Sequence, residues 1–339
     1  MPVSNPPECT AYSGGFLFIL DLTMNFQCTK EDKITNNIIE VSNLEKKYGD
    51  VNAVNGVSFS VEKGEVFGIL GPNGAGKTTT IEIIEGLRKP NSGSIKICDI
   101  DALKEPQRIK ELIGVQLQTT SLYDSIRVKE AIELFGSYYK KSIPANIILE
   151  EVSLSEKKNG SVSQLSGGQK QRLSVGLALV NDPEVIFMDE PTTGLDPQAR
   201  HNIWSIVEQL RDRGKTIVMT THYMEEAEQL CHRLAIIDQG KIIAMDTPDN
   251  LINHAALETA IEFSTSKELD GLANQIPGIR KLNNGSVRKY SVSTKAVSLI
   301  LKNLTNLCYD NQIDLENISV RKATMEDVFL AMTGRKLRE

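Results

Sequence analysis

The 339-residue sequence has no run of 18 or more apolar residues, so it offers no candidate for a helix that crosses a bilayer. Aromatic residues make up only 5% of the chain, and 38 basic against 44 acidic residues give a net charge of −6. Binding of nucleic acid through stacked aromatic side chains or a basic surface is therefore not expected. The hydrophobic fraction of 40% excludes bulk disorder, and the length suggests two domains.

Cysteine pairs with metal-site or redox spacing are also absent. The five cysteines are scattered, none in a Cys-x-x-Cys pair, which favours reduced thiols in a cytosolic protein without a zinc site. The first 29 residues contain no Lys or Arg, and their apolar run at 16–20 is short. A secretory signal is therefore not expected. We predict that residues 1–36 form a disordered extension.

Short apolar runs alternate with helical patterns through the middle of the chain. Residues 124–153 are predicted to be mostly helical, with apolar positions at Ile132, Leu134, Phe135 and Tyr138. The predicted strands are 38–44, 57–61, 66–70, 95–97, 185–188, 217–219 and 234–237, and the other predicted helices are 78–87, 170–180 and a stretch around 203–210. This alternation is typical of an α/β fold whose largely parallel sheet is covered on both faces.

The pattern changes after residue 248. From Thr259 the chain alternates like a strand, residues 296–307 have helical spacing, and Thr324 with Asp327 forms the start signal of a final helix. We therefore assign 257–339 to a small α+β domain.

A glycine-rich loop lies between the strand at 66–70 and the helix after it. Its residues, Gly71, Pro72, Asn73, Gly74, Ala75, Gly76, Lys77 and Thr78, match G-x-x-x-x-G-K-[S/T], and Thr79 follows. Glycines let successive backbone N–H groups point at phosphate oxygens, and the helix N-terminus adds partial positive charge. Lys77 is predicted to reach the β- and γ-phosphates, and Thr78 to ligate Mg²⁺. A chance glycine-rich turn is the alternative, which the flanking strand and helix disfavour.

Two carboxylates follow the apolar strand at 185–188. Asp189 is placed to hold Mg²⁺ through water, and Glu190 to activate an attacking water as a general base. A solvated acidic loop is the alternative. His222 follows the strand at 217–219, where ligands of parallel sheets gather, although a lone histidine is more often structural.

A second anion-binding surface is predicted at a helix start. Its residues are Leu165, Ser166, Gly167, Gly168 and Gln169. Two phosphate-binding surfaces in one chain would be explained if two chains share the nucleotide.

These motifs, in this order, resemble the ATP-binding cassette (ABC) family over about residues 38–255. The resemblance implies a P-loop NTPase domain at 37–256, with a mostly parallel core, an antiparallel β subdomain and a helical subdomain at about 119–178. It further implies that Gln118, rather than nearby Gln116, touches Mg²⁺ and the permease interface. Asp196 would lie in the D-loop, His222 would be the switch histidine, and Tyr48 would stack on adenine.

The resemblance also implies partners. ATP with Mg²⁺ would lie between the Gly71–Thr78 loop of one chain and Leu165–Gln169 of another, in a homodimer or heterodimer that drives separate membrane permease subunits at the cytoplasmic face of the membrane. The tail at 325–330 and 333–335 is similar to that of the drug- and antibiotic-export branch. The alternatives are a soluble ATPase acting on ribosomes or nucleic acid, and a module whose C-terminal domain senses a ligand rather than serving as a spacer.

Overall fold

The computed structural model describes residues 36–117, 122–254, 259–269, 276, 278–284, 287–321 and 323–333. The extension predicted at 1–36 lies outside this part, apart from Asn36, and stays a prediction. No helix within the described residues is long and apolar enough to cross a membrane.

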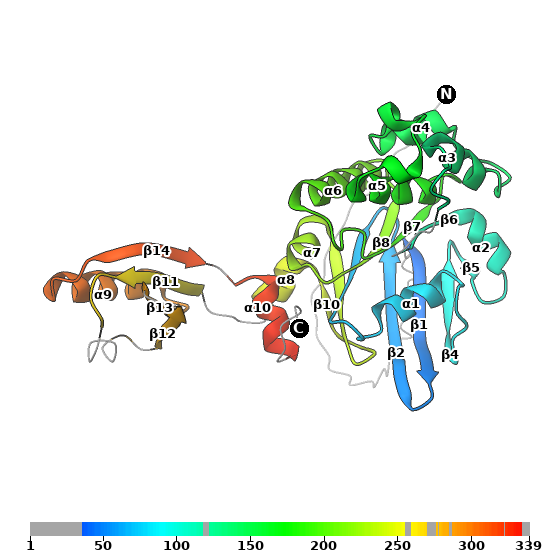
Figure 1. Cartoon of the computed structure of the whole chain (residues 1–339). Helices are drawn as coiled ribbons and strands as arrows, with labels where there is room; N and C mark the ends of the chain where they lie inside the picture. The colour runs from blue at the N-terminus through cyan, green and yellow to red at the C-terminus, as the bar shows by residue number, and fades with distance from the viewer. Residues whose placement is uncertain are drawn as a thin grey trace, which may run out of the picture. The chain divides into compact units, whose positions relative to one another are not determined.

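A six-stranded sheet, with strand order β10-β9-β3-β8-β7-β6, forms the centre of the fold (Figure 1). Its strands are β3 (Val66–Leu70), β6 (Ile113–Gln116), β7 (Val185–Asp189), β8 (Thr216–Thr221), β9 (Arg233–Asp238) and β10 (Lys241–Asp246). All neighbours pair in parallel except β9 and β10. The predicted α/β class with a largely parallel sheet is therefore confirmed.

The central strands are buried on both faces, which explains their continuous apolar runs. Every residue of β3, β7 and β8 is buried. Ile186 and Ile217 face a core shared with the helices at 128–151 and 167–212, whereas Phe187 and Val218 face a core shared with a second sheet. Two separate hydrophobic cores thus hold the sheet from opposite sides.

The second sheet is antiparallel and has the order β2-β1-β4-β5. Its strands are β1 (Asn37–Tyr48), β2 (Val51–Glu62), β4 (Ser92–Ile97) and β5 (Ile100–Asp101). β1 and β2 form a long hairpin, visible in blue in Figure 1. The antiparallel β subdomain implied by the family resemblance is present.

The helices of the central region are α1 (Lys77–Ile84), α2 (Pro106–Leu112), α3 (Val128–Gly136), α4 (Ala145–Glu151), α5 (Gly167–Ala178), α6 (Pro197–Asp212), α7 (Met224–Leu230) and α8 (Pro248–His254), with short 3₁₀ turns at Ser155–Lys157 and Val162–Gln164. The mostly helical stretch predicted at 124–153 is two separate helices, because residues 137–144 separate α3 from α4. Pro144 stands at the start of α4, where its missing N–H costs nothing. Leu134 and Tyr138, expected on an apolar face, are 40% and 72% exposed.

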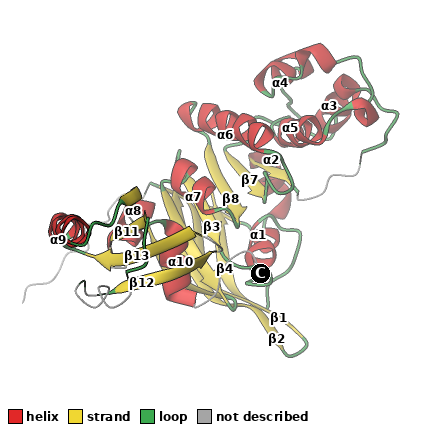
Figure 2. Cartoon of the chain, turned by 60° about the vertical axis from the view of Figure 1, so that its left-hand side comes forward, coloured by secondary structure: helices red, strands yellow, loops and turns green. Residues whose placement is uncertain are grey.

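The C-terminal region holds a third sheet, with the order β12-β13-β11-β14. Its elements are β11 (Thr259–Thr265), β12 (Ile279–Asn284), β13 (Val287–Thr294), α9 (Val297–Asp310) and β14 (Leu315–Arg321), followed by α10 (Met325–Thr333). α9 packs Ile300 and Leu304 against Phe263 and Tyr290 of the sheet. Figure 2 shows this sheet beside α9, with helices in red and strands in yellow.

The last helix belongs to a different core. Met325, Val328 and Phe329 of α10 are buried with Leu70 and Leu251, in a cluster that also includes residues of α7 and β9. The Thr324 N–H and hydroxyl both donate to Asp327, so the helix start predicted from Thr324 and Asp327 is confirmed. Helix α10 therefore packs on the central region.

Candidate active site

The glycine-rich loop joins β3, in the middle of the six-stranded sheet, to the N-terminus of α1. Gly76 caps α1 with φ of +102°, a conformation that favours glycine. A Cβ atom on Gly76 would stand 2.1 Å from the carbonyl oxygen of Ala53, so only glycine fits there. Packing and backbone conformation thus explain the loop's final glycine before any ligand is considered.

Lys77, the first residue of α1, is 4% exposed. Its Nζ donates to the carbonyl oxygens of Gly71 at 2.9 Å and Pro72 at 3.3 Å, and lies 3.4 Å from Glu190 Oε1. Burial lowers the pKa of Lys77, while the negative charge of Glu190 opposes that shift. The loop therefore holds a desolvated cation whose main charge partner is Glu190.

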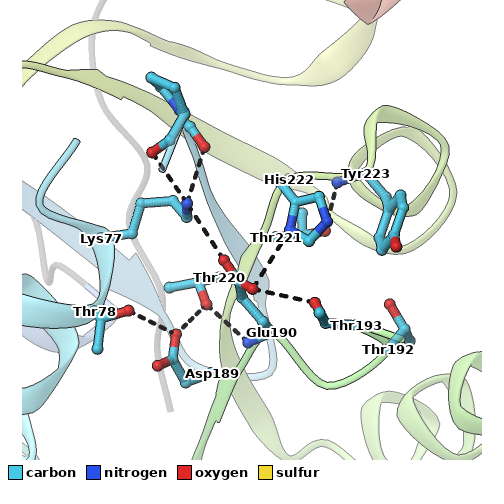
Figure 3. A network of polar contacts seen from close by, with 12 residues as sticks. Lys77, Thr78, Asp189, Glu190, Thr192, Thr193, Thr220, Thr221, His222 and Tyr223 are labelled. Carbon is cyan, nitrogen blue, oxygen red and sulfur yellow. Dashed lines mark hydrogen bonds and ion pairs between the residues drawn. The ribbon is translucent and has the colours of Figure 1, made fainter. Parts of the chain in front are cut away.

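Asp189 is the last residue of β7, and Glu190 follows it in the turn (Figure 3). The Thr78 hydroxyl donates to Asp189 Oδ1 at 3.4 Å, and the Thr220 hydroxyl donates to the same oxygen. Burial raises the pKa of Asp189, and these two hydrogen bonds work against the rise. Thr78 and Asp189 present hard oxygen atoms side by side, the ligand chemistry that Mg²⁺ prefers.

Glu190 stands at the meeting point of three side chains. Its carboxylate lies 3.4 Å from Lys77 Nζ and 3.4 Å from His222 Nδ1, and it accepts a hydrogen bond from the Thr193 hydroxyl at 3.1 Å. The contact with His222, together with the charge of Lys77, lowers the pKa of Glu190 to about 2, although burial alone would raise it. At neutral pH this carboxylate is ionised.

A cleft of about 490 Å³ opens over these groups, within the size range of small-molecule sites. The residues that line it come from the loop, α1 and the strand ends, and they are Ala53, Asn73, Gly74, Gly76, Lys77, Thr78, Thr79, Glu190, Thr193 and His222. His222 follows the end of β8, so the predicted lysine, glutamate and histidine do converge at the carboxyl ends of neighbouring parallel strands.

The residues at 165–169 do not line this cleft. Ser166 caps α5, accepting from the N–H of Gln169, while the Gln169 side chain accepts from the N–H of Ser166. Gly168 packs so closely on α6 that a Cβ atom there would stand 2.7 Å from Ala199 Cβ. Asp196 caps α6 by accepting from the N–H of Ala199 at 2.8 Å. The predicted signature and D-loop residues thus meet at two adjacent helix starts.

Tyr48 is a predicted nucleotide-binding residue that does not line the cleft. Tyr48, at the end of β1, is 42% exposed and has Lys46 and Arg88 near its ring, 5.2 and 5.9 Å from the centroid. Gln118 lies outside the described residues. Its competitor Gln116 is buried at the end of β6, where its side chain donates to the carbonyl oxygen of Leu117.

Two polar residues that the sequence did not single out take part in the same region. Thr220 contacts Asp189 and also accepts the N–H of Glu190 at 2.9 Å. Glu226 of α7 is fully buried and accepts from the Thr192 hydroxyl and the Trp204 indole, which links α7 to α6. The contacts of Thr220 and Glu226 depend on how the strands and helices pack together. The sequence signal for Thr220 was a polar residue in an apolar strand, and for Glu226 it was a polar residue on the buried face of a helix.

Comparison with known proteins matches residues 54–193 to the family model described as "ABC transporter". The chain is 39% identical over 312 residues to Nod factor export ATP-binding protein I of Burkholderia lata, covering 89% of this chain and 98% of that protein. It is 36% identical over 311 residues to linearmycin resistance ATP-binding protein LnrL of Bacillus subtilis, covering 89% of this chain and all of that protein.

Solved structures agree with this relationship. The ADP conformation of MJ1267, an ATP-binding cassette of an ABC transporter, is 31% identical with a TM-score of 0.57, covering 63% of this chain and 92% of that one. A dimeric, post-hydrolysis structure of the cassette MJ0796, bound to ADP and Pi, is 29% identical with a TM-score of 0.56, covering 62% and 98%. The chain belongs to the ABC transporter family of ATP-binding cassettes.

Proposed function

We propose that this chain is the subunit that binds and hydrolyses ATP to power export through a separate membrane permease, at the cytoplasmic face of the membrane. The observation that carries the proposal is the convergence of Lys77, Glu190 and His222 at one cleft beside Asp189. The names of the relatives, which concern Nod factor export and linearmycin resistance, favour export over the ribosomal alternative.

The cleft suits a triphosphate. Lys77 and the loop residues Gly71, Pro72, Asn73, Gly74, Ala75 and Gly76, with Thr78 and Thr79, would surround the phosphates with backbone N–H groups and one buried positive charge. Tyr48 would stack on adenine if its ring turns from Lys46 and Arg88 toward the base.

Thr78 and Asp189 would hold Mg²⁺, Asp189 through water, and we assign the same metal-facing role to Gln118. The metal supplies positive charge that offsets charge developing on the phosphate oxygens. The oxygen atoms of Thr78 and Asp189 fit this role because they already share a hydrogen bond.

Glu190 would act as the general base. Its carboxylate is ionised and therefore able to accept a proton from water. Lys77 and His222 both lower its pKa, and both would turn toward a bound terminal phosphate. Glu190 would then lose two contacts that lower its pKa and become more basic when the substrate is in place.

The second half of the site would come from another chain. Leu165, Ser166, Gly167, Gly168 and Gln169 would close over the ATP bound by a partner, and Asp196 would lie at the same interface. This proposal is supported by their position away from the cleft of their own chain.

Replacing Glu190 with Gln tests the assignment. We expect Glu190→Gln to bind ATP but to lower steady-state hydrolysis about 100- to 10,000-fold, the usual contribution of a general base. Light scattering should show an ATP-dependent dimer that persists. Glu184→Gln is the matched control, since Glu184 is an exposed carboxylate one residue before β7. Equal hydrolysis by wild type and Glu190→Gln would remove Glu190 from the catalytic role.

A further inference from the structure

Thr220 is the residue of β8 that lies beside Asp189 of β7 in the parallel register. It is fully buried. The Thr220 hydroxyl donates its one proton to Asp189 Oδ1, and the Thr220 hydroxyl oxygen accepts a hydrogen bond from the backbone N–H of Glu190 at 2.9 Å. One hydroxyl therefore contacts both acidic residues, one through its side chain and the other through its backbone (Figure 3).

The contact with Glu190 lies where the strand pairing stops. Asp189 and Thr220 are the last paired residues of β7 and β8, so Glu190 follows the ladder. Glu190 also has φ of +47°, in the left-handed region that non-glycine residues rarely adopt. The Thr220 hydroxyl thus supplies a hydrogen bond at an unfavourable turn, and the turn decides where the Glu190 side chain points.

The hydroxyls of the two other threonines of β8, Thr221 and Thr216, have different hydrogen-bond partners. The Thr221 hydroxyl accepts from the N–H of Tyr223 at 2.9 Å, in the turn that carries His222. Thr216, at the other end of β8, accepts from the N–H of Gly64 at 3.0 Å, and is as buried as Thr220. Only Thr220, of these three, contacts the end of β7 through its hydroxyl.

We propose that Thr220 is a positioning residue for ATP hydrolysis, whose hydroxyl fixes both the metal-facing carboxylate of Asp189 and the backbone turn that presents Glu190. This inference rests on the proposed function, and it adds to that function a residue that acts through Asp189 and Glu190 without touching the nucleotide.

Thr220→Val tests the proposal in the full-length chain, because valine keeps the branched shape and removes the hydroxyl. We expect steady-state hydrolysis, or the apparent affinity for Mg²⁺, to fall about 10- to 100-fold, as for other groups that orient metal ligands. ATP binding measured in EDTA should stay within about twofold of wild type, since the loop residues are unchanged. Thr220→Ser keeps the hydroxyl and should restore the wild-type Mg²⁺ requirement.

A second readout needs neither metal nor nucleotide. The Glu190 amide of the wild-type chain should be protected from hydrogen exchange although it lies beyond the paired strand, and Thr220→Val should lose that protection. Rapid exchange of this amide in the wild type would overturn the proposal even if the valine variant did not fold.

Thr216→Val is the matched control, because it removes a buried hydroxyl from the same strand, far from Asp189. It should keep the wild-type Mg²⁺ requirement. If Thr216→Val and Thr220→Val had the same effect, or if Thr220→Val matched wild type, Thr220 would have no positioning role. Those outcomes leave the proposed function intact, whereas a wild-type chain as inactive as Glu190→Gln would contradict the function itself.

Discussion

Glu85 is a carboxyl group buried at the end of α1, 4% exposed, with no hydrogen-bond partner for its Oε1. Burial raises its pKa to about 8, and the nearby negative charges of Asp189 and Glu82 add to the rise. Most molecules at neutral pH therefore carry Glu85 in its neutral form. The sequence pattern marked 78–87 as helical but did not reveal this burial.

The contribution of Glu85 to the stability of the fold should consequently fall as pH rises. The folded pKa of about 8 exceeds the ordinary 4.5, so the stabilisation from neutral Glu85 is complete below pH 4.5 and is lost as pH rises toward 8. Glu85→Gln has no carboxyl group to ionise. The difference in free energy of unfolding between Glu85→Gln and wild type should therefore increase, in favour of the variant, by up to about 1.4 kcal/mol per pH unit in that window. Urea unfolding at pH 5, 6.5 and 8 measures this. Glu150→Gln, which replaces an exposed carboxyl group of α4, is the control. Parallel curves for wild type and Glu85→Gln would refute the burial effect.

At the same scale, the residues of the site divide into those that a motif reveals and those that only the register reveals. Asp189, Glu190 and the loop that leads to Lys77 follow apolar strands, so their convergence followed from the rule that parallel strand ends meet. Thr220 was visible as a threonine before His222, but its contact with Asp189 depends on the pairing of β7 with β8. No local pattern specifies that pairing.

At the scale of elements, α10 shows where local signals end. The capping pattern of Thr324 and Asp327 correctly predicted a helix start, because it depends on neighbouring residues only. The partners of α10, which include Leu70 and Leu251, are more than 70 residues away, and no periodicity identifies them. The N–H of Met325 also donates to Glu228 of α7 at 2.7 Å, which fixes the start of the helix on the central region.

Phe329→Ala measures how firmly α10 is docked. Phe329 is 1% exposed in the core that α10 shares with α7 and α8, so its truncation should lower the free energy of unfolding by about 3–5 kcal/mol. Leu330→Ala, on the same helix, removes a side chain that is 40% exposed and should cost much less. Urea denaturation compares the two variants. Similar midpoints would mean that α10 adds little to the stability of the central region.

At the scale of the whole molecule, the proposed function divides the ATP site into two halves that one chain presents at different places. The phosphate loop and Glu190 line one cleft, whereas Ser166 caps a helix start that does not line it. The close packing of Gly168 on Ala199 ties that helix start to the beginning of α6. The resemblance in sequence suggested this division, and the absence of residues 165–169 from the lining of the cleft supports the proposal that a second chain supplies the other half.

Mixing two inactive variants tests that arrangement for a homodimer. Lys77→Ala removes the charge that faces the phosphates, and Ser166→Arg blocks the surface that would close over a partner's nucleotide, so each variant alone should hydrolyse no ATP. In a head-to-tail dimer of one chain of each kind, one site combines the intact loop of the Ser166→Arg chain with the intact Ser166 of the other. Equal mixing should therefore restore hydrolysis to about a quarter of wild type, because half of the dimers are mixed and each has one complete site. If mixed dimers form, as mass spectrometry would establish, and hydrolysis stays absent, the two half-sites do not act across the dimer.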